Sequence, residues 1–269
     1  SPLYSTGTKL KVGTYALTDG LAKLGYAMSQ TGGSQLTVTQ KALTFAGLVI
    51  SNKVYDGNTT ANLGIGSVTL PNKIAGDVVS VSSVTGAFDT RDVGTGKTVS
   101  ITAGTLTGAD AANYTVSVSG QGGTANITQL ASATWVGGTG NWNTAANWAV
   151  TGNLGQTGVL PDGGNVGLAI IPSTAGGVSG AAAFTGVVTG YASGHQGKIQ
   201  INGGTLAVSA DNFLGATPGA AVADKITLNG GTLQATNSFT LDTNRGITLG
   251  ASGGTFSVDA SKSVAYAGI

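Results

Sequence analysis

The sequence predicts an all-β protein, in which a small β-sandwich is followed by a parallel β-helix. Three observations predict this fold class. Glycine makes up 46 of the 269 residues, and all 11 acidic residues are aspartate. The polar positions are mostly threonine, serine and asparagine, which together with glycine favour strands and turns over helices. Short runs alternate apolar and polar residues, and one such phrase occurs three times in the last third of the chain.

Composition excludes several classes of partner and site. Only 9% of the residues are charged and the net charge is +1, which argues against binding to nucleic acid or to an anionic membrane. The absence of cysteine excludes disulfides and thiolate metal sites. No run approaches the ~20 apolar residues of a membrane span, so we expect no membrane insertion. Ser1 and Ile269 both fall within patterned segments, and we expect the chain to be a piece of a longer protein.

Residues 1–40 predict a partial β domain. Alternating segments at 9–18, 25–29 and 35–40 are separated by Asp19-Gly20 and Gly32-Gly33, which are turn signals. Three strands are too few for an independent core. We expect them to end a preceding unit or to pair with a neighbour.

Residues 41–129 predict a sandwich of about seven short strands with regular turns. Val99, Ile101 and Tyr114 lie in alternating segments and are expected in the core. Tyr55 is expected to anchor the tight turn that Asp56 caps with its carboxylate. Asp110 is expected to cap a single helical turn in the same way.

This segment resembles the YDG domain. The resemblance rests on Tyr55-Asp56-Gly57, on Val93-Gly94-Thr95-Gly96-Lys97, and on the stretch from Gly108-Ala109-Asp110 to Asn113-Tyr114. The family occurs in tandem in giant secreted bacterial adhesins, often beside related MBG domains. It implies an immunoglobulin-like sandwich, with a β-grasp fold as the alternative. The LTVTQ ending of residues 1–40 parallels NITQ at 126–129, so a similar unit is expected to precede this one.

Residues 130–269 predict a parallel β-helix. Ile199, Ile201, Leu206 and Val208 recur 27 residues later, and a third copy follows 21 to 23 residues after the second. Each copy places two alternating strands around a Gly-Gly corner, where glycine accommodates positive φ. A unit that cannot bury its apolar face alone must stack on its neighbours. The phrase is also similar to the passenger-associated repeat of bacterial autotransporter adhesins.

The start of this region is rich in tryptophan. Residues 134–150 carry all three tryptophans and resemble the segment that opens the β-helix of autotransporter passengers. The indoles are expected to cover the open end of the helix. Alternatively they form a platform on which sugar rings stack. The candidate ligand contacts are these three indoles and one tyrosine further along the chain: Trp135, Trp142, Trp148 and Tyr191. Residues 151–198 are expected to be irregular, loop-bearing coils.

No catalytic, cofactor or metal site is predicted. Residues 94–98 imitate a phosphate-binding loop, but Arg91 replaces the first glycine and a strand pattern follows, so a hairpin turn is expected. His195 is the only histidine and is expected to be an exposed loop residue. Asp89 and Asp92 form at most a suggestive calcium pair. The remaining aspartates of interest lie beside turns and are expected to cap them: Asp211, Asp224, Asp242 and Asp259.

The sequence therefore predicts a segment of a secreted or surface-displayed bacterial adhesin. It would act without catalysis as an elongated stalk that contacts glycans, matrix or cell surfaces through many weak hydrogen bonds. One alternative is a structural subunit of an extracellular filament or biofilm fibre, self-associating head to tail. Another is a polysaccharide-degrading β-helix enzyme, which requires two aspartates paired in a cleft.

Overall fold

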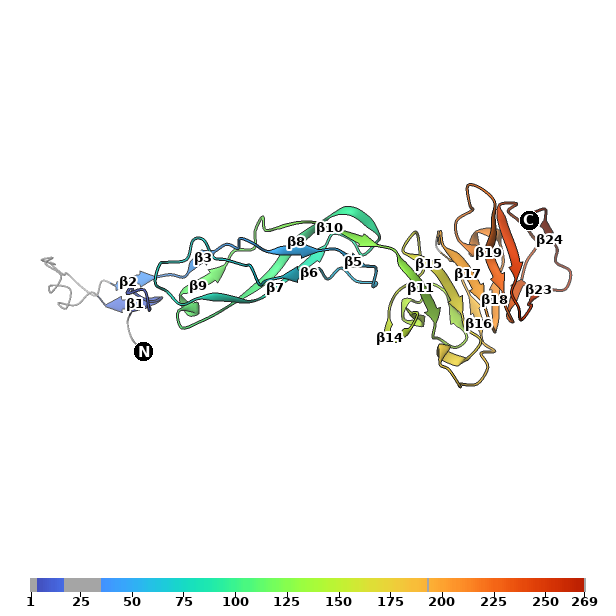
Figure 1. Ribbon diagram of the computed structural model, residues 1–269, viewed down its shortest axis with the longest axis horizontal. Coiled ribbons are helices and arrows are strands. Elements are labelled where there is room, and N and C mark those ends of the chain that lie inside the picture. Colours follow the sequence, from blue (N-terminus) through green and yellow to red (C-terminus); the bar gives the residue numbers. More distant parts are fainter. Residues whose placement is uncertain (1–3, 17–34, 193, 269) are drawn as a thin grey trace, which may run out of the picture. The chain divides into compact units, whose positions relative to one another are not determined.

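The computed structural model describes residues 4–16, 35–192 and 194–268 (Figure 1). It is mostly β, and the described residues contain short 3-10 turns but no α-helix. None of these 3-10 turns is long and apolar enough to cross a membrane. The chain divides into two compact units. The first comprises residues 1–51, 60–89 and 98–125, and the second comprises residues 52–59, 90–97 and 126–269.

The first unit holds short strand pairs. β1 (Gly13–Ala16) pairs antiparallel with β2 (Gln35–Val38), β3 (Lys41–Leu43) pairs parallel with β9 (Tyr114–Val116), and β4 (Val49–Ser51) pairs antiparallel with β6 (Asn62–Gly64). The strand predicted at 25–29 lies outside the described residues. Leu43, Val79 and Tyr114 form a buried cluster, and Val99 and Ile101 are buried as predicted.

A four-stranded sheet has the order β5-β10-β8-β7. Its strands are β5 (Lys53–Val54), β10 (Gly122–Thr128), β8 (Gly94–Thr107) and β7 (Ser80–Phe88). Residues 94–97 are the first residues of β8, so the hairpin turn predicted at 94–98 lies earlier, at residues 89–93 between β7 and β8. The prediction that a strand and not a helix follows Lys97 is confirmed.

Residues 5–7 are bound by two buried carboxylates of the first unit. Asp77 accepts hydrogen bonds from Ser5 Oγ (2.5 Å) and Gly7 N (2.9 Å), and from the Tyr114 hydroxyl (2.6 Å). Asp110 accepts from Thr6 N (3.0 Å) and Val78 N (2.9 Å). A hydrogen bond from the Thr6 hydroxyl, together with those from the two backbone amides, holds the pKa of Asp110 below its usual value. In this structure the described part of residues 1–40 is thus attached to its own chain.

Asp110 corrects one prediction. The 3-10 turn Ala111–Asn113 follows it as expected, but the Asp110 side chain makes no capping hydrogen bond to that turn. Its carboxylate is used instead by Thr6 and Val78, which are distant in the sequence.

The second unit contains two larger sheets. One is seven-stranded, in the order β14-β13-β11-β15-β17-β19-β22, and the other is five-stranded, in the order β12-β16-β18-β20-β23. The strands of the first are β14 (Asn153–Thr157), β13 (Trp148–Val150), β11 (Leu130–Trp135), β15 (Val166–Ile171), β17 (Lys198–Ile201), β19 (Val222–Leu228) and β22 (Arg245–Leu249). Those of the second are β12 (Gly140–Asn141), β16 (Val187–Thr189), β18 (Thr205–Val208), β20 (Thr232–Ala235) and β23 (Thr255–Val258).

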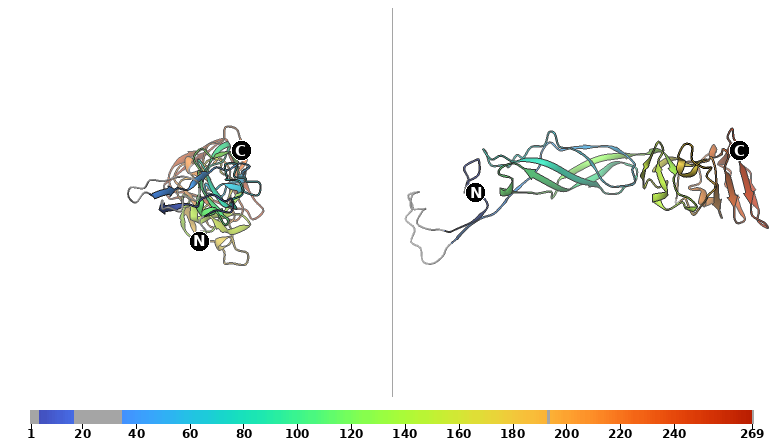
Figure 2. Two further views of the ribbon diagram at one scale, coloured as in Figure 1. Left: turned by 90° about the vertical axis from the view of Figure 1, so that its left-hand side faces the viewer. Right: turned by 90° about the horizontal axis from the view of Figure 1, so that it is seen from below.

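From β17 onward the chain visits the two sheets alternately, and equivalent strands lie side by side and parallel (Figures 1 and 2). A third, two-stranded pairing joins β21 (Phe239–Leu241) and β24 (Val264–Tyr266).

The predicted repeat sets the register of these parallel strands. Ile199 pairs with Ile226 and Ile226 with Ile247, while Leu206 pairs with Leu233 and Leu233 with Phe256. Equivalent residues of the three copies therefore stack in rows, as predicted. The side chains of the first two copies are at most 1% exposed. In the third copy Leu249 is 63% exposed and Phe256 40%.

Glycine allows the tight corners between the two sheets. Gly204 and Gly230 have φ values of +58° and +110°, in the left-handed region that favours glycine. At Gly231 a Cβ atom would overlap the Ile201 side chain below it. The Gly-Gly corners therefore serve both the backbone turn and the close approach of successive copies.

The prediction that residues 151–198 are irregular is wrong in part. Strand β15 lies within this range and pairs with β11 on one side and β17 on the other. Val166, Ala169 and Ile171 of this strand are fully buried. A central strand with both faces partly covered shows a continuous apolar run, here at residues 166–172, in place of clear alternation.

Candidate functional site

Two hollows in the second unit are candidate binding sites. We call one the basic hollow; it has a volume of about 570 Å³, and its lining includes Gln129, Gln196, Lys198, Thr217, Pro218 and Lys225. We call the other the polar hollow; it has a volume of about 510 Å³ and is lined by Asp92, Val93, residues 162–165 and Gln196. Gln196 lines both hollows, and neither was predicted from the sequence.

Lys225 is the buried cation of the basic hollow. It lies in β19, is 3% exposed, and donates from Nζ to the backbone oxygens of Gln196 (2.8 Å) and Gly197. Burial, together with the positive charge of Arg245, lowers the pKa of Lys225 to about 8. Lys198, in β17, is half exposed and its Nζ lies 2.5 Å from Asp224 Oδ2.

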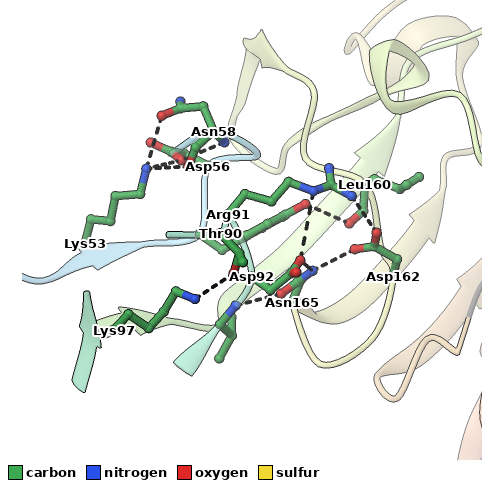
Figure 3. A network of polar contacts seen from close by, with 12 residues as sticks. Lys53, Asp56, Asn58, Thr90, Arg91, Asp92, Lys97, Leu160, Asp162 and Asn165 are labelled. Carbon is green, nitrogen blue, oxygen red and sulfur yellow. Dashed lines mark hydrogen bonds and ion pairs between the residues drawn. The ribbon is translucent and has the colours of Figure 1, made fainter. Parts of the chain in front are cut away.

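A network of polar contacts borders the polar hollow (Figure 3). Arg91 Nη2 donates to Asp162 Oδ2 (2.6 Å). Asn165 donates from Nδ2 to Asp92 (2.9 Å) and to Asp162 (2.7 Å), while its Oδ1 accepts from Val93 N (2.9 Å). Asn165 thus joins the loop of residues 90–93 to the loop of residues 160–165, both in the second unit.

The Tyr55-Asp56-Gly57 turn packs against residues 158–160 of the same unit. Tyr55 is 1% exposed and its hydroxyl donates to Leu160 O (3.3 Å). Burial raises the pKa of Tyr55 to about 12, and the negative charge of Asp162 acts in the same direction. The hydroxyl therefore keeps its proton and remains a donor. Gly57 has a φ of +79°, and a Cβ atom there would overlap the Gly158 backbone oxygen.

The predicted cap by Asp56 is confirmed. Its Oδ1 accepts from Asn58 N (3.2 Å) and also lies 2.6 Å from Lys53 Nζ, in a pair whose lysine side chain is 4% exposed (Figure 3). The carboxylates and amides of this region are therefore engaged with one another. The arrangement suits the packing of three loops rather than proton transfer or nucleophilic chemistry.

The calcium hypothesis for Asp89 and Asp92 gains no support here. Asp92 faces the Asn165 amide and lies 3.9 Å from the Arg91 guanidinium, a cation beside the carboxylate. Within the described ranges, no cluster of three or more histidine, cysteine or acidic residues is suited to hold a metal ion.

The three tryptophans form one buried cluster. Trp135 and Trp148 meet edge to face with ring centroids 5.2 Å apart, and Trp142 and Trp148 are 4.5 Å apart. All are at most 1% exposed, and each indole N–H donates to a backbone oxygen. The interpretation of Trp135, Trp142 and Trp148 as a stacking platform is wrong for this structure, because no ring face is open. Tyr191 is 36% exposed and packs on Phe213, so it alone of the four candidates is accessible.

The prediction that His195 is an exposed loop residue is wrong. It is fully buried, and its ring centroid lies 5.9 Å from that of Trp142. Nε2 lies 3.2 Å from the Lys198 carbonyl oxygen, so Nε2 carries the hydrogen. Nδ1 has no hydrogen-bond partner among the described residues. Burial lowers the pKa of His195 to about 4. The glycine-rich sequence around this residue gave no sign of its burial.

Among the aspartates of the C-terminal region, Asp211 and Asp242 are neighbours, because Asp211 Oδ1 accepts from Asp242 N (3.1 Å). Only Asp242 caps its turn as predicted, by accepting from Asn244 N (2.8 Å). Asp259 accepts from Gln234 Nε2 (2.7 Å), and Asp224 pairs with Lys198. Asp211 accepts from Arg245 Nε (2.9 Å) and Nη2 (3.1 Å), which corrects its assignment as a turn cap.

Arg245 was not singled out in the sequence. Its side chain is fully buried and also donates to Leu214 O (2.9 Å) and Gly215 O (3.2 Å). A bidentate arginine that also satisfies two backbone oxygens holds the Asp211–Leu214 turn to β22.

Comparison with known families identifies one domain. Residues 39–125 match the model of the YDG domain, so the chain contains a YDG domain. The loops that carry Tyr55-Asp56-Gly57 and residues 90–97 lie within this match, although both belong to the second compact unit. Neither the curated proteins nor the solved structures gave a match.

Proposed function

We propose that this chain, which contains a YDG domain, is a segment of a secreted or surface-displayed bacterial adhesin. In this proposal residues 41–129 form an immunoglobulin-like sandwich and residues 130–269 a parallel β-helix. Together they serve as a stalk that presents contacts to glycans, matrix or other cells. The presence of the YDG domain supports the proposal, as do the parallel sheets whose register follows the sequence repeat.

The single observation that carries the proposal is the stacking of equivalent residues from successive repeats. Each copy buries its apolar residues only by lying on the next, so stability is shared between neighbours and length is added without a wider core. Polar side chains alternate with the buried apolar ones, as with Gln200 and Thr227, which are partly exposed. Such a surface suits many weak hydrogen bonds.

A non-catalytic role fits the placement of the aspartates. A glycosidase needs two carboxylates about 5 to 10 Å apart across one cleft. In this structure Asp224 and Asp259 have separate partners, Lys198 and Gln234. Asp211 and Asp242 are neighbours, since Asp211 Oδ1 accepts from Asp242 N (3.1 Å), but Asp211 is bound by the buried Arg245 and Asp242 caps its own turn. We therefore favour binding over polysaccharide cleavage.

The proposal is tested by adhesion under multivalent display. Beads densely coated with the full chain should be retained on bacterial or epithelial cells or on a glycan array. The free chain should bind the same surface more weakly by roughly 100-fold, because tethered copies bind with high effective concentration. Beads carrying heat-unfolded chain are the control. Retention no greater than that of albumin-coated beads on every surface would contradict the proposal.

A second candidate, a subunit of an extracellular filament, is favoured by one observation. Leu249, Phe256, Val258 and Tyr266 expose between 37% and 63% of their surface. They lie in β22, β23 and β24, strands whose edges and apolar side chains suit pairing with another chain. Electron microscopy of native material without crosslinking distinguishes the two candidates. Regular filaments with one repeat per chain support the subunit, and single rods fixed to cells at one end support the adhesin.

A further inference from the structure

The basic hollow gathers positive charge in a chain that has little. The chain has 12 lysine and arginine residues in 269. Two of them, Lys198 and Lys225, line this one hollow, and none of its described lining residues is acidic. Among the described residues, Asp224 forms an ion pair with Lys198, and Asp224 is not part of the lining.

Lys225 is a buried cation with no opposite charge beside it. Its described partners are two backbone oxygens, and no ion pair to it occurs within the described part of the chain. An ammonium group has three hydrogens to donate, so one remains after these two bonds. A buried charge is normally paired, because the loss of water is otherwise uncompensated. The same loss of water on burial lowers the pKa of Lys225.

The rest of the lining can hold a sugar ring. Gln129 donates to Gly164 O (2.8 Å), which leaves its amide oxygen as an acceptor. Thr217 adds a hydroxyl, and Pro218 and Val222 add apolar surface suited to the C–H face of a ring. The volume of about 570 Å³ is within the range of small-ligand sites.

We propose that the basic hollow binds the oxyanion of an acidic saccharide, with Lys225 as the central cation and Lys198 as the second. The inference rests on the proposed adhesin function and specifies its ligand class. A uronate carboxylate and a sulfate ester share the required chemistry, since both accept charge-assisted hydrogen bonds from ammonium groups.

The test is a titration of the full chain by NMR and calorimetry. The probes are glucuronate, glucose 6-sulfate, neutral glucose and inorganic sulfate. Glucuronate or glucose 6-sulfate should shift the amide resonances of residues 196–198 and 216–219, and the stronger probe identifies the source of the oxyanion. Lys225→Met should weaken binding at least 10-fold. Lys262→Met removes a lysine that is exposed and outside the hollow, and should leave binding unchanged.

Further variants keep the test valid if Lys225→Met does not fold. Lys198 and Asp224 are both half exposed, so their substitution should be tolerated. Lys198→Met should weaken binding several-fold, whereas Asp224→Asn should strengthen it by releasing Lys198. Equal binding of glucose would overturn the inference. So would inorganic sulfate binding as tightly as either acidic sugar, which would indicate an adventitious ion only, and so would resonance shifts confined to other regions.

The inference and the proposed function fail in different ways. If beads coated with Lys225→Met adhere to cells and glycans as well as beads coated with the parent chain, the adhesin function is supported and the oxyanion site is refuted. If the chain binds glucuronate through Lys225 but its beads adhere to nothing, the site stands and the adhesin function falls.

Discussion

His195 and Arg245 show how single buried polar residues shape the second unit. Both are fully buried, but their polar atoms are satisfied differently. Arg245 has a carboxylate and two backbone oxygens as partners, whereas the Nδ1 atom of His195 has none among the described residues. Partners that hydrogen-bond a buried polar group offset the free-energy cost of removing it from water. A buried titratable group without such a partner makes the stability of the fold depend on pH.

His195 predicts an acid-sensitive second unit. Its pKa is about 4 in the folded chain and 6.5 in the unfolded chain, so below pH 6.5 the unfolded state binds more protons. Its contribution to stability is complete above pH 6.5 and is lost as the pH falls toward 4, by about 3 kcal/mol in total. Urea unfolding of the parent and of His195→Gln should differ in pH slope over this range. If the unfolding free energies of the two proteins change equally with pH, His195 does not control the acid sensitivity.

Arg245 predicts a large cost for breaking a buried pair. Arg245→Met leaves two backbone oxygens without their arginine donor and removes the cation beside Asp211, which keeps the hydrogen bond from Asp242 N (3.1 Å). It should reduce the unfolding free energy of the second unit by about 3 kcal/mol. Lys198→Met breaks a pair that is half exposed on both sides and should cost under about 1 kcal/mol. Chemical denaturation of both variants makes the comparison. A loss as small for Arg245→Met as for Lys198→Met would refute the assigned role.

At the scale of elements, three loops and one glycine determine how the YDG turn packs. Asn165 connects the loop of residues 90–93 to that of residues 160–165, and Tyr55 reaches Leu160, which is 105 residues away. The Tyr55-Asp56-Gly57 turn therefore serves as a packing contact within the second unit.

Gly57 tests this contact, because the chain offers a matched control. Gly57 and Gly96 have similar φ values, +79° and +61°, but only Gly57 has backbone where a Cβ would lie, and nothing is within 4 Å of that point at Gly96. Gly96→Ala should cost about 1 kcal/mol through backbone conformation alone. Gly57→Ala should cost distinctly more and speed amide hydrogen exchange at residues 158–160. Equal costs for the two variants would argue against close packing here.

At the scale of the whole molecule, stability in the repeat region depends on the position of a residue in the stack. The row of Leu206, Leu233 and Phe256 is continuous in register, yet Leu233 is fully buried and Phe256 is 40% exposed. Equivalent residues of one sequence phrase therefore contribute differently to the free energy of unfolding, because only the inner copies have neighbours on both sides.

This difference gives a prediction about the stack. Leu233→Ala should destabilise the second unit by about 2 to 5 kcal/mol, since it leaves a cavity between two copies. Phe256→Ala removes a larger side chain but should cost less, because much of that side chain is already in water. Thermal and denaturant unfolding of the two variants provides the measurement. The reverse order of destabilisation would contradict the stacking seen here.

The sequence by itself determined the β character, the YDG segment and the register of the repeats. It did so because alternation, glycine corners and repeat spacing are local properties, and the spacing of 27 residues between Ile199 and Ile226 directly became a strand pairing. The cap by Asp56 and the strand after Lys97 were predictable for the same reason.

Only the tertiary structure decided which polar groups are buried and which of them meet. His195 lies in a glycine-rich loop and Lys225 in strand β19. Their burial depends on distant segments, which bring Trp142 beside His195 and residues 196–197 beside Lys225. The indoles of residues 134–150 could be predicted as apolar surface, but whether their faces meet one another or a ligand depends on three-dimensional packing. Burial of a charge is a property of its surroundings, and these are assembled only when distant segments come together.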